Sequence, residues 1–286
     1  MSVAPPAAPS WRTARRRLAL DRACIVGIIN VTPDSFSDGG RHFAPEDAVA
    51  AGRAMRAAGA DILDVGGEST RPGAATPSTS EELRRVIPVI ERLAGEVGLP
   101  VSVDTRRAEV AVRALEAGAE IVNDVSGLAR DPAMAGAVAD AGAGLVLMHM
   151  RGEPDTMDAL ATYEDVVADV ASELAERRDH ALAAGISAEA IVLDPGLGFA
   201  KNPEQNLALL NHLEAIVALG HPILVGPSRK RFLGVLTGRP AQERDAATAA
   251  ACVAARLRGA SLFRVHDVAL AREALSVADA ILGAGD

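Results

Sequence analysis

The sequence predicts an α/β protein folded as a (β/α)8 TIM barrel, in which eight parallel strands are surrounded by outer helices. Eight short apolar runs rich in Val and Ile recur along the chain, and such runs are typical of buried strands. Stretches rich in Ala, Glu and Arg, with helical spacing, separate these runs. Nearly every run ends in a polar residue, and the carboxyl ends of barrel strands are where active sites lie. The pattern therefore predicts an enzyme.

Strands and helices are predicted to alternate regularly from residue 24 to the end of the chain. The predicted strands span residues 24–30, 61–70, 101–104, 121–124, 145–150, 191–196, 223–230 and 262–266. The predicted helices span residues 45–58, 80–97, 107–117, 132–141, 163–184, 203–210, 241–258 and 268–282. Several of these helices are followed by glycine, which supplies the left-handed conformation that ends many helices. This alternation is typical of right-handed βαβ crossovers, which build a parallel sheet.

Length and composition favour one barrel domain with a small-molecule partner. The chain has 286 residues, 49% of them hydrophobic and 2% aromatic, so aliphatic side chains must fill the core. Its net charge of −9 argues against nucleic acid as the main partner. We predict a partly disordered N-terminal tail over residues 1–17 and a single domain over residues 18–286. Residues 11–22 are expected to form a short strand or hairpin that covers the bottom of the barrel.

The cysteines and the N-terminus indicate the compartment. Cys24 and Cys252 are the only cysteines, which argues against a disulfide framework or a zinc site, and both are expected to be buried. The N-terminal arginines precede no small-residue cleavage site, so we expect no signal peptide. No apolar run reaches the roughly 18 residues that a membrane-spanning helix needs. We therefore expect a cytoplasmic protein without a membrane partner.

Two long segments rich in Gly, Pro, Ser, Thr and Asp follow the first two predicted strands, at residues 31–44 and 66–79. On the catalytic face of a barrel such loops often serve as lids. Asn30 precedes the first loop, and its amide oxygen is a reasonable single ligand for a Mg²⁺ ion that otherwise binds water and phosphate. In the second loop, Thr70 and Arg71 offer a hydroxyl and a planar cation that suit phosphate oxygens. Ordinary turns and a solvated surface arginine are the alternatives.

Three further polar residues end predicted strands: Asp104, Asn123 and Asp194 end the third, fourth and sixth. We expect each to reach the top of the barrel from a different side. Isolated buried carboxylates are costly unless they accept hydrogen bonds. A flat heterocycle with amino and ring N–H donors would supply those bonds. The alternative for each residue alone is a helix N-cap in the loop that follows.

Cations gather after the last two strands. The seventh run continues as Gly-Pro-Ser-Arg-Lys-Arg, with Ser228 and Lys230, and the eighth ends in Arg264-Val-His266-Asp. Barrels commonly bind phosphate after these strands, and residues two apart point to the same face of a strand. The basic pair of Arg264 and His266 therefore indicates an anionic substrate group. His149 ends the fifth strand, and the sequence leaves open whether it is structural or catalytic.

Together these segments resemble one family, the dihydropteroate synthases, at the level of motifs from about residue 18 to the end. The matching motifs are GIINVTPDSFSDGG, DILDVGGESTRPGA, SVDT, IVNDVSG, LMHMRGEPDTM, DPGLGFAKN, GPSRKRFLG and RVHDV. The resemblance implies a TIM-barrel transferase of folate biosynthesis that uses Mg²⁺. It would join 6-hydroxymethyl-7,8-dihydropterin pyrophosphate to p-aminobenzoate and release pyrophosphate. It also implies a homodimer and a target for sulfonamides.

The resemblance assigns expected roles to individual residues. The catalytic residues would be Asp104, Asp194, Lys230 and Arg264. The pterin would be held by Asp104, Asn123, Asp194 and Lys230. The pyrophosphate would lie near Arg264, His266, Thr70, Arg71 and Asn30, with Asn30 also holding Mg²⁺. The p-aminobenzoate pocket would include Phe36, Pro72, Phe199 and Ser228.

The chemistry of the residues agrees with this reaction. Pyrophosphate departs well only when its charge is neutralised, which calls for cations and a metal. Its departure would leave a cationic methylene group, which nearby carboxylates such as Asp104 and Asp194 would favour. An aniline nitrogen is a weak nucleophile, so positioning should matter more than a strong base. We therefore expect an SN1-like substitution without a covalent enzyme intermediate.

Two positions depart from the family pattern, and two alternative functions stay open. Gln205 stands where many members carry His, and Arg231 stands where many carry a Ser that touches the p-aminobenzoate carboxylate. Whether Asp34 or Asp38 approaches Mg²⁺ is undecided. One alternative is a pterin-binding methyltransferase domain, which needs no pyrophosphate site. The other is a non-catalytic paralogue, which should have lost loop or phosphate residues that this chain retains.

Overall fold

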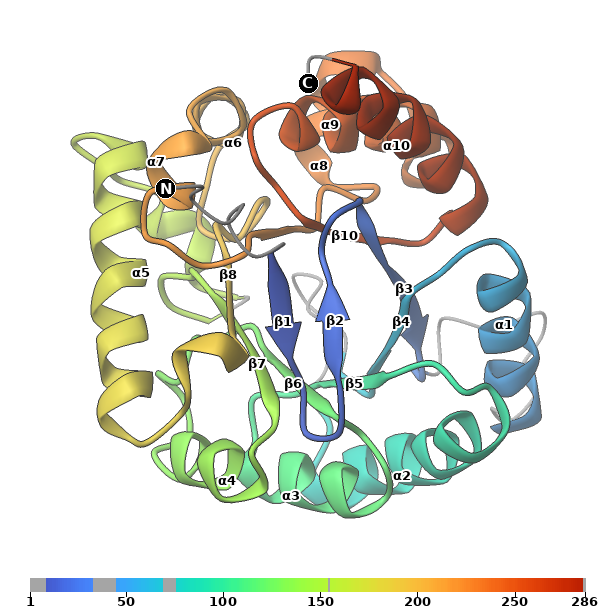
Figure 1. Cartoon of the computed structure of the whole chain (residues 1–286). Helices are drawn as coiled ribbons and strands as arrows, with labels where there is room; N and C mark the ends of the chain where they lie inside the picture. The colour runs from blue at the N-terminus through green and yellow to red at the C-terminus, as the bar shows by residue number, and fades with distance from the viewer. Residues whose placement is uncertain (1–8, 33–44, 69–75, 154, 285–286) are drawn as a thin grey trace, which may run out of the picture.

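The computed structural model describes residues 9–32, 45–68, 76–153 and 155–284, and it confirms the (β/α)8 barrel (Figure 1). The barrel strands are β3 (Cys24–Asn30), β4 (Ile62–Gly66), β5 (Val101–Asp104), β6 (Ile121–Asp124), β7 (Gly144–Met148), β8 (Ile191–Asp194), β9 (Leu224–Val225) and β10 (Leu262–Val265). All neighbours pair in parallel, in the order β8-β7-β6-β5-β4-β3-β10-β9. An isolated bridge between Leu193 and Ile223 links β8 to the segment that enters β9, which closes the ring.

Helices surround the strands on the outside. The α-helices are α1 (Pro45–Ala57), α2 (Thr79–Glu96), α3 (Ala108–Glu116), α4 (Met134–Ala141), α5 (Val166–Ala183), α6 (Pro203–Asn211), α7 (Glu214–Val217), α8 (Arg231–Thr237), α9 (Asp245–Arg256) and α10 (Val268–Gly283). The short 3-10 helices are η1 (Met157–Leu160), η2 (Ala188–Ala190) and η3 (Ala241–Glu243). The sequence did not predict α7 and α8, and the single helix predicted over residues 241–258 is divided into η3 and α9. Within the described ranges, no helix has the length and apolar character needed to cross a membrane.

The alternation of side chains along each strand positions the site. Successive residues point to opposite faces, so outward side chains such as Ile25 and Leu63 pack beneath the helices. Inward side chains near the start of the strands, such as Ile62, form an apolar cluster at the bottom of the barrel. Two residues further along, the inward positions are polar, as in Asp64 of β4. The barrel interior therefore changes from apolar to polar toward the carboxyl ends of the strands.

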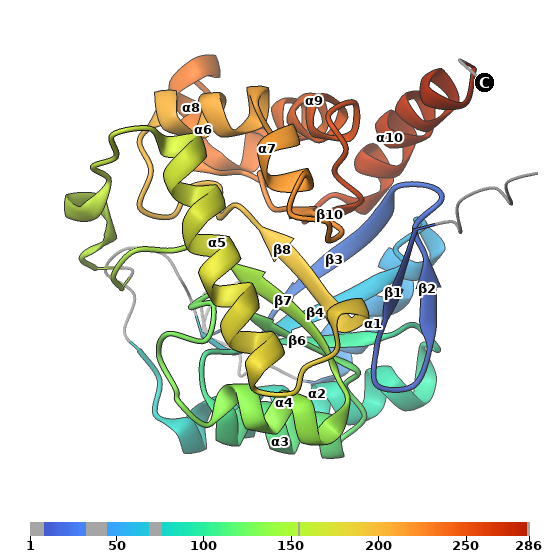
Figure 2. The same cartoon turned by 60° about the vertical axis from the view of Figure 1, so that its left-hand side comes forward.

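An antiparallel hairpin of β1 (Ser10–Arg12) and β2 (Arg17–Ala19) covers the bottom of the barrel, as expected for residues 11–22. Figures 1 and 2 show it across the end opposite the strand-to-helix loops. Trp11 is 1% exposed, belongs to the bottom cluster, and donates from Nε1 to the carbonyl of Ala190 at 2.8 Å. The hairpin also binds buried Glu120, whose carboxylate accepts from Thr13 Oγ1 at 2.7 Å.

The seventh strand is much shorter than predicted. Residues 223–230 were expected to form it, but β9 contains only Leu224 and Val225. Pro222 and Pro227 flank this pair, and proline has no N–H to donate to a neighbouring strand. The chain therefore leaves the sheet early, and Ser228 and Lys230 line the mouth of the barrel instead.

Candidate active site

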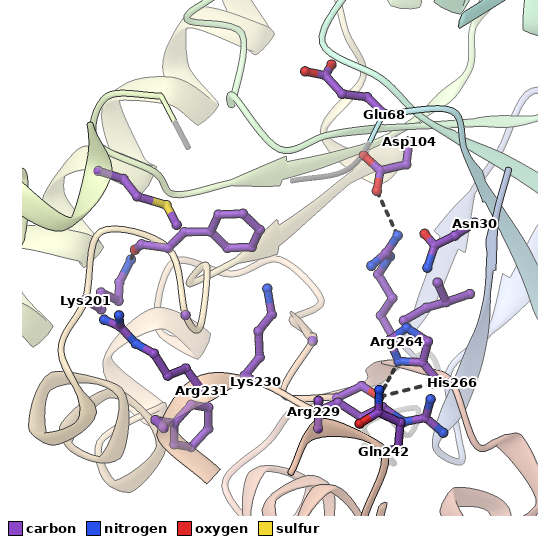
Figure 3. A pocket seen from close by; sticks show the side chains of 18 of the residues that line it. Asn30, Glu68, Asp104, Lys201, Arg229, Lys230, Arg231, Gln242, Arg264 and His266 are labelled. Atoms are coloured by element: carbon purple, nitrogen blue, oxygen red, sulfur yellow. Dashed lines mark hydrogen bonds and ion pairs between the residues drawn. The ribbon is translucent and has the colours of Figure 1, made fainter. Parts of the chain in front are cut away.

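A cavity of about 570 Å³ lies at the carboxyl ends of the strands (Figure 3). Its lining includes these residues that the sequence singled out: Asn30, Asp104, Phe199, Ser228, Lys230, Arg264 and His266. They come from β3, β5 and β10 and from the segments that follow β8, β9 and β10. The structure thus brings together groups that lie at opposite ends of the chain.

Four predicted site residues lie outside the described residues, namely Phe36, Thr70, Arg71 and Pro72. Asp34 and Asp38, whose approach to Mg²⁺ was left open, lie outside them as well. Their expected roles stay predictions.

Arg264 is the centre of a polar network on the floor of the cavity. Its Nη2 donates to Asp104 Oδ2 at 2.7 Å, and its Nε donates to Asp64 Oδ2 at 2.6 Å (the first pair is dashed in Figure 3). The side-chain amide of Asn123 also donates to Asp64 Oδ2, at 3.1 Å. Burial raises the pKa of Asp104, while the charge of Arg264 opposes this rise. The Arg264 guanidinium therefore contacts Asp104, one of the strand-end residues predicted to bind the heterocycle, and is connected to a second, Asn123, through Asp64.

Asp64 is a residue that the sequence analysis missed. It is 1% exposed, lies in the middle of β4, and connects Arg264 to Asn123. The signal was present in the run Ile-Leu-Asp-Val-Gly, because an alternating strand that directs Ile62 inward must also direct Asp64 inward. Asp64 lies one layer below the strand ends, where only strand-end residues had been considered as candidates.

Asp194 ends β8 beneath a tight turn. Its Oδ1 accepts from the backbone N–H of Gly196 at 2.7 Å. Burial raises the pKa of Asp194 to about 6, and this hydrogen bond limits the rise. Gly196 has a φ of +69°, and a Cβ there would lie 1.9 Å from the carbonyl oxygen of His149, so only glycine fits. The turn therefore fixes the position of the Asp194 carboxyl, while burial raises its pKa.

Lys230 and Phe199 form one wall. The Lys230 Nζ lies 3.8 Å from the centroid of the Phe199 ring, in the geometry of a cation–π contact. Burial, helped by the charge of Arg264, lowers the pKa of Lys230 to about 8. The charges of Asp194 and Asp104 oppose this shift. The ammonium group thus has an aromatic face on one side and a carboxylate-rich floor on the other.

His266 differs from the prediction that it forms a basic pair with Arg264. Burial lowers the pKa of His266 to about 3, and the charge of Arg264 adds to the effect, so the imidazole is neutral at pH 7. Ser228 Oγ accepts the backbone N–H of His266 at 3.1 Å and lies 2.8 Å from its Nδ1. A neutral imidazole has one N–H donor and one acceptor nitrogen, and the contact with Ser228 holds the ring in place. His266 is therefore a neutral polar group in the cavity wall.

His149, whose role was left open, has a structural position. It is fully buried, and its Nε2 lies 3.0 Å from Glu173 Oε2 while its Nδ1 lies 2.9 Å from Lys201 Nζ. Lys201, also missed by the sequence analysis, donates in addition to the carbonyl of Phe199 at 2.9 Å. Burial lowers the pKa of His149 to about 4, so it stays neutral and accepts from the lysine. This buried cluster supports the turn that carries Asp194 and Phe199.

Arg106 and Arg107, which we call the loop clamp, hold both ends of the segment that carries Thr70, Arg71 and Pro72. On the near side, Arg106 Nη2 donates to Glu68 at 2.6 Å. On the far side, Arg107 Nη2 donates to the carbonyl of Pro77 at 2.7 Å. Arg106 also pairs with Glu153, which follows β7, so the clamp connects two loops at the mouth of the barrel.

The two departures from the family pattern have different surroundings. Gln205 completes a capping box at the start of α6, since its side-chain oxygen accepts the backbone N–H of Asn202 at 2.8 Å. Its role here is therefore to begin a helix. Arg231 lines the cavity and pairs with Asp158 of η1 at 3.3 Å, with both side chains largely exposed. A surface pair of this kind contributes little to stability and leaves Arg231 able to meet an anion.

The raised pKa of Asp194 has a consequence for the dependence of pterin binding on pH. If the ionised carboxylate accepts hydrogen bonds from the ligand, kcat/KM for a pterin substrate should fall as pH drops through about 6, by up to about tenfold per pH unit. The sign follows from the shift: a carboxyl with a raised pKa loses its charge nearer neutrality. Asp194→Asn should have a lower kcat/KM at high pH, and its kcat/KM should fall less as pH drops through about 6. If kcat/KM of the wild type were constant from pH 8 to pH 5, the proposed binding of the ligand by ionised Asp194 would be wrong.

The comparisons with known proteins agree with this site. The family described as "Pterin binding enzyme" matches residues 26–266. The dihydropteroate synthase of Mycobacterium leprae is 52% identical over 272 residues, which cover 91% of this chain and 94% of that protein. The Xanthomonas albilineans dihydropteroate synthase with 4-aminobenzoic acid has a TM-score of 0.90 and 50% identity, covering 96% of this chain and 98% of that one.

Two further solved structures carry informative ligands. The Xanthomonas albilineans enzyme in complex with 7,8-dihydropteroate has a TM-score of 0.87 and 48% identity, covering 96% of this chain and 99% of that one. The Yersinia pestis dihydropteroate synthase with a sulfonamide drug complex has a TM-score of 0.91 and 41% identity, covering 96% of this chain and 99% of that one. The resemblance drawn from the motifs is therefore confirmed, and this chain belongs to the dihydropteroate synthase family.

Proposed function

We propose that this chain is a transferase of folate biosynthesis that condenses 6-hydroxymethyl-7,8-dihydropterin pyrophosphate with p-aminobenzoate to give 7,8-dihydropteroate and pyrophosphate. The observation that carries the proposal is the cavity floor, where Arg264 joins Asp64 and Asp104 beneath a wall that contains Lys230. Relatives with 4-aminobenzoic acid and with 7,8-dihydropteroate support the two ends of the reaction.

The pterin end of the substrate would suit the oxygen acceptors at the strand ends, of which Asp104 lines the cavity while Asn123 and Asp194 are 4% and 5% exposed and do not line it. Asp104, Asn123 and Asp194 supply oxygen atoms from three strands, and an aminopyrimidinone edge offers amino and ring N–H donors to match them. Loss of pyrophosphate would place positive charge on the methylene carbon, and the carboxylates of Asp104 and Asp194 would stabilise it. The bond to the leaving oxygen breaks before the C–N bond forms, which is the SN1-like order.

The pyrophosphate end fits the donors around β10. The Arg264 guanidinium carries a fixed charge, and neutral His266, which also lines the cavity, would add one ring N–H. Thr70 and Arg71 would add to this group. Together they would offset the charge that develops on the leaving group.

The residues present fit a Mg²⁺ ion that the substrate shares. Asn30 Oδ1 and Asp104 Oδ2 lie 3.8 and 3.7 Å from the Cβ position of a side chain at Gly66, so the two oxygens lie near each other on the same side of the cavity. Oxygen ligands are those that Mg²⁺ prefers. Among the described residues no group of three His, Cys, Asp or Glu could hold a metal alone, so further ligands would come from water, from pyrophosphate or from outside the described part of the chain. Asn30 would hold the ion, which when bound would neutralise charge on the leaving group.

The p-aminobenzoate end requires positioning of a weak nucleophile. Phe199 and Ser228 line the cavity, and Phe36 and Pro72 would complete the pocket. The amine nitrogen attacks the methylene carbon and then loses one proton, which the released pyrophosphate can accept. Arg231 lies at the same mouth and would meet the carboxylate where many relatives carry serine.

A turnover assay tests the proposal. Purified protein should convert dihydropterin pyrophosphate and p-aminobenzoate into dihydropteroate and pyrophosphate in equal amounts, with a loss of rate when Mg²⁺ is chelated. A sulfonamide should inhibit competitively with p-aminobenzoate, because both occupy the same pocket. Protein that binds pterin but forms no product would support the non-catalytic paralogue, whereas methyl transfer from methyltetrahydrofolate would support the methyltransferase alternative.

We also propose that the chain forms a homodimer through α8, α9 and α10. Val235 and Leu236 of α8 are 63% and 56% exposed, and Val277 and Ile281 of α10 are 60% and 59% exposed. Exposed apolar side chains gathered on adjacent helices are typical of an interface. Sedimentation should give twice the chain mass of 29.4 kDa, and Leu236→Glu should give the monomer. A monomer in the wild type would contradict the proposal.

The cytoplasmic location expected from the sequence stays a prediction.

A further inference from the structure

Asp64 connects Arg264, which lines the cavity, to Asn123, which like Asp64 is buried and does not line it. We propose that Asp64 is a positioning residue for the reaction, which fixes the Arg264 guanidinium and makes Asn123 accept, rather than donate, a hydrogen bond at the pterin. The inference rests on the proposed function and adds to it the origin of pterin selectivity.

The position of the guanidinium follows from two contacts on different strands. Asp64 Oδ2 on β4 binds Arg264 Nε at 2.6 Å, and Asp104 Oδ2 on β5 binds Nη2 at 2.7 Å. A guanidinium is planar and rigid, so two anchored nitrogens determine the orientation of its plane. With Asp104 alone the group could rotate about a single contact. Asp64 therefore determines which face Arg264 presents to a ligand.

The polarity of Asn123 follows from the chemistry of its partner. An ionised carboxylate only accepts hydrogen bonds, so the amide must present its NH2 group to Asp64 Oδ2, which lies 3.1 Å away. With its NH2 group held at Asp64, the amide of Asn123 cannot flip, so its oxygen keeps a fixed place on the opposite side of the amide. A ligand with an N–H facing that oxygen is matched, whereas a ligand with an acceptor there would be repelled by it. Asp64 thus sets the hydrogen-bond pattern that Asn123 recognises.

Folding stability does not explain why Asp64 is placed here. Its Oδ1 is buried and accepts no hydrogen bond within the described part of the chain, which is a costly arrangement. A cavity of about 10 Å³ beside it is lined by Ser102 and Asn123, with space for at most one water molecule. An apolar residue would fill this layer of the barrel at lower cost. The carboxylate is therefore better explained by what it does to Arg264 and Asn123.

The test compares Asp64→Asn with a matched control, Ser102→Ala. Ser102 is the β5 partner of Asp64 and lines the same small cavity, but it contacts neither Arg264 nor Asn123 in the hydrogen bonds of the described residues. We would measure KM for each substrate, kcat, the Kd of 6-hydroxymethylpterin, and thermal melting. Asp64→Asn should raise the pterin Kd by roughly 10- to 100-fold, the range for a hydrogen bond to a charged group, with KM for p-aminobenzoate unchanged. Ser102→Ala should bind pterin as the wild type does.

A double-mutant cycle separates positioning from a general structural role. If Asp64 acts through Asn123, then adding Asn123→Ala to Asp64→Asn should weaken pterin binding much less than Asn123→Ala does in the wild type. If the melting temperature of Asp64→Asn lies below that of the wild type, Asp64→Ser replaces it in the same cycle. Additive losses, equal losses for both substrates, or wild-type pterin affinity would each overturn the inference. Wild-type turnover is measured first, so a failure of the proposed function is seen separately, and the pterin Kd still tests Asp64.

Discussion

Arg264→Ala is expected to lower kcat/KM for dihydropterin pyrophosphate by roughly a thousandfold, the largest effect of any single substitution at this site. The substitution leaves two buried carboxylates, Asp64 and Asp104, without their shared cation. Removing one partner of a buried ion pair costs about 3–5 kcal/mol of stability. Loss of one donor to the charge that develops in the transition state lowers the rate by roughly 100- to 1,000-fold. The donor for the leaving pyrophosphate is lost as well. Steady-state kinetics with both substrates varied would measure the loss.

The matched control for this variant is Arg256→Ala. Arg256 forms a similarly buried pair with Asp279, at 2.7 Å, between α9 and α10 and away from the cavity. It should lower stability while leaving kcat/KM near the wild-type value. If both variants lose activity in proportion to their loss of stability, Arg264 has no special role in the reaction.

Trp11→Ala is expected to lower the free energy of unfolding by about 3–5 kcal/mol, because truncation of a buried aromatic side chain leaves a cavity. Trp11 fills the bottom of the barrel and binds the carbonyl of Ala190. Urea unfolding followed by circular dichroism would measure the change, since Trp11 is the only tryptophan and its fluorescence is lost with it.

Trp11→Phe provides the comparison for this variant. It keeps most of the apolar volume but removes the 2.8 Å hydrogen bond, so it should cost less than Trp11→Ala. Equal midpoints for Trp11→Ala and the wild type would mean that the hairpin contributes nothing to the stability of the barrel.

Strand periodicity explains why the sequence predicted so much of the fold. The strand predicted at residues 24–30 is β3 to the residue, because a run rich in buried Val and Ile follows the charged pair Asp21-Arg22 and ends at polar Asn30. β9 was overestimated because its flanking residues are apolar but two of them are prolines. α8 was missed because it is short, contains Gly234, ends at Gly238, and depends on packing against α6 and α9.

The sequence predicted the site residues at the strand ends but not Asp64, which lies one layer below them. Asp104, Lys230, Arg264 and His266 line one cavity, as expected for residues at the top of a barrel. The neutral state of His266 could not be inferred from sequence, because it depends on burial and on the charge of Arg264 across the cavity. Long-range contacts set both effects, and no local pattern records them.

The loop clamp has a consequence for how this enzyme can evolve. Since Arg106 and Arg107 belong to the β5–α3 junction, the attachment points of residues 69–75 are set by a part of the chain that the segment does not contain. If the segment meets p-aminobenzoate as proposed, substitutions within it can alter what it offers to that substrate or to a drug that mimics it, without releasing its ends. Under selection by such a drug, substitutions in this segment could weaken binding of the drug relative to p-aminobenzoate at little cost to folding. Changes in Arg106 or Arg107 would give no such freedom, because they would disturb every substrate that the segment meets.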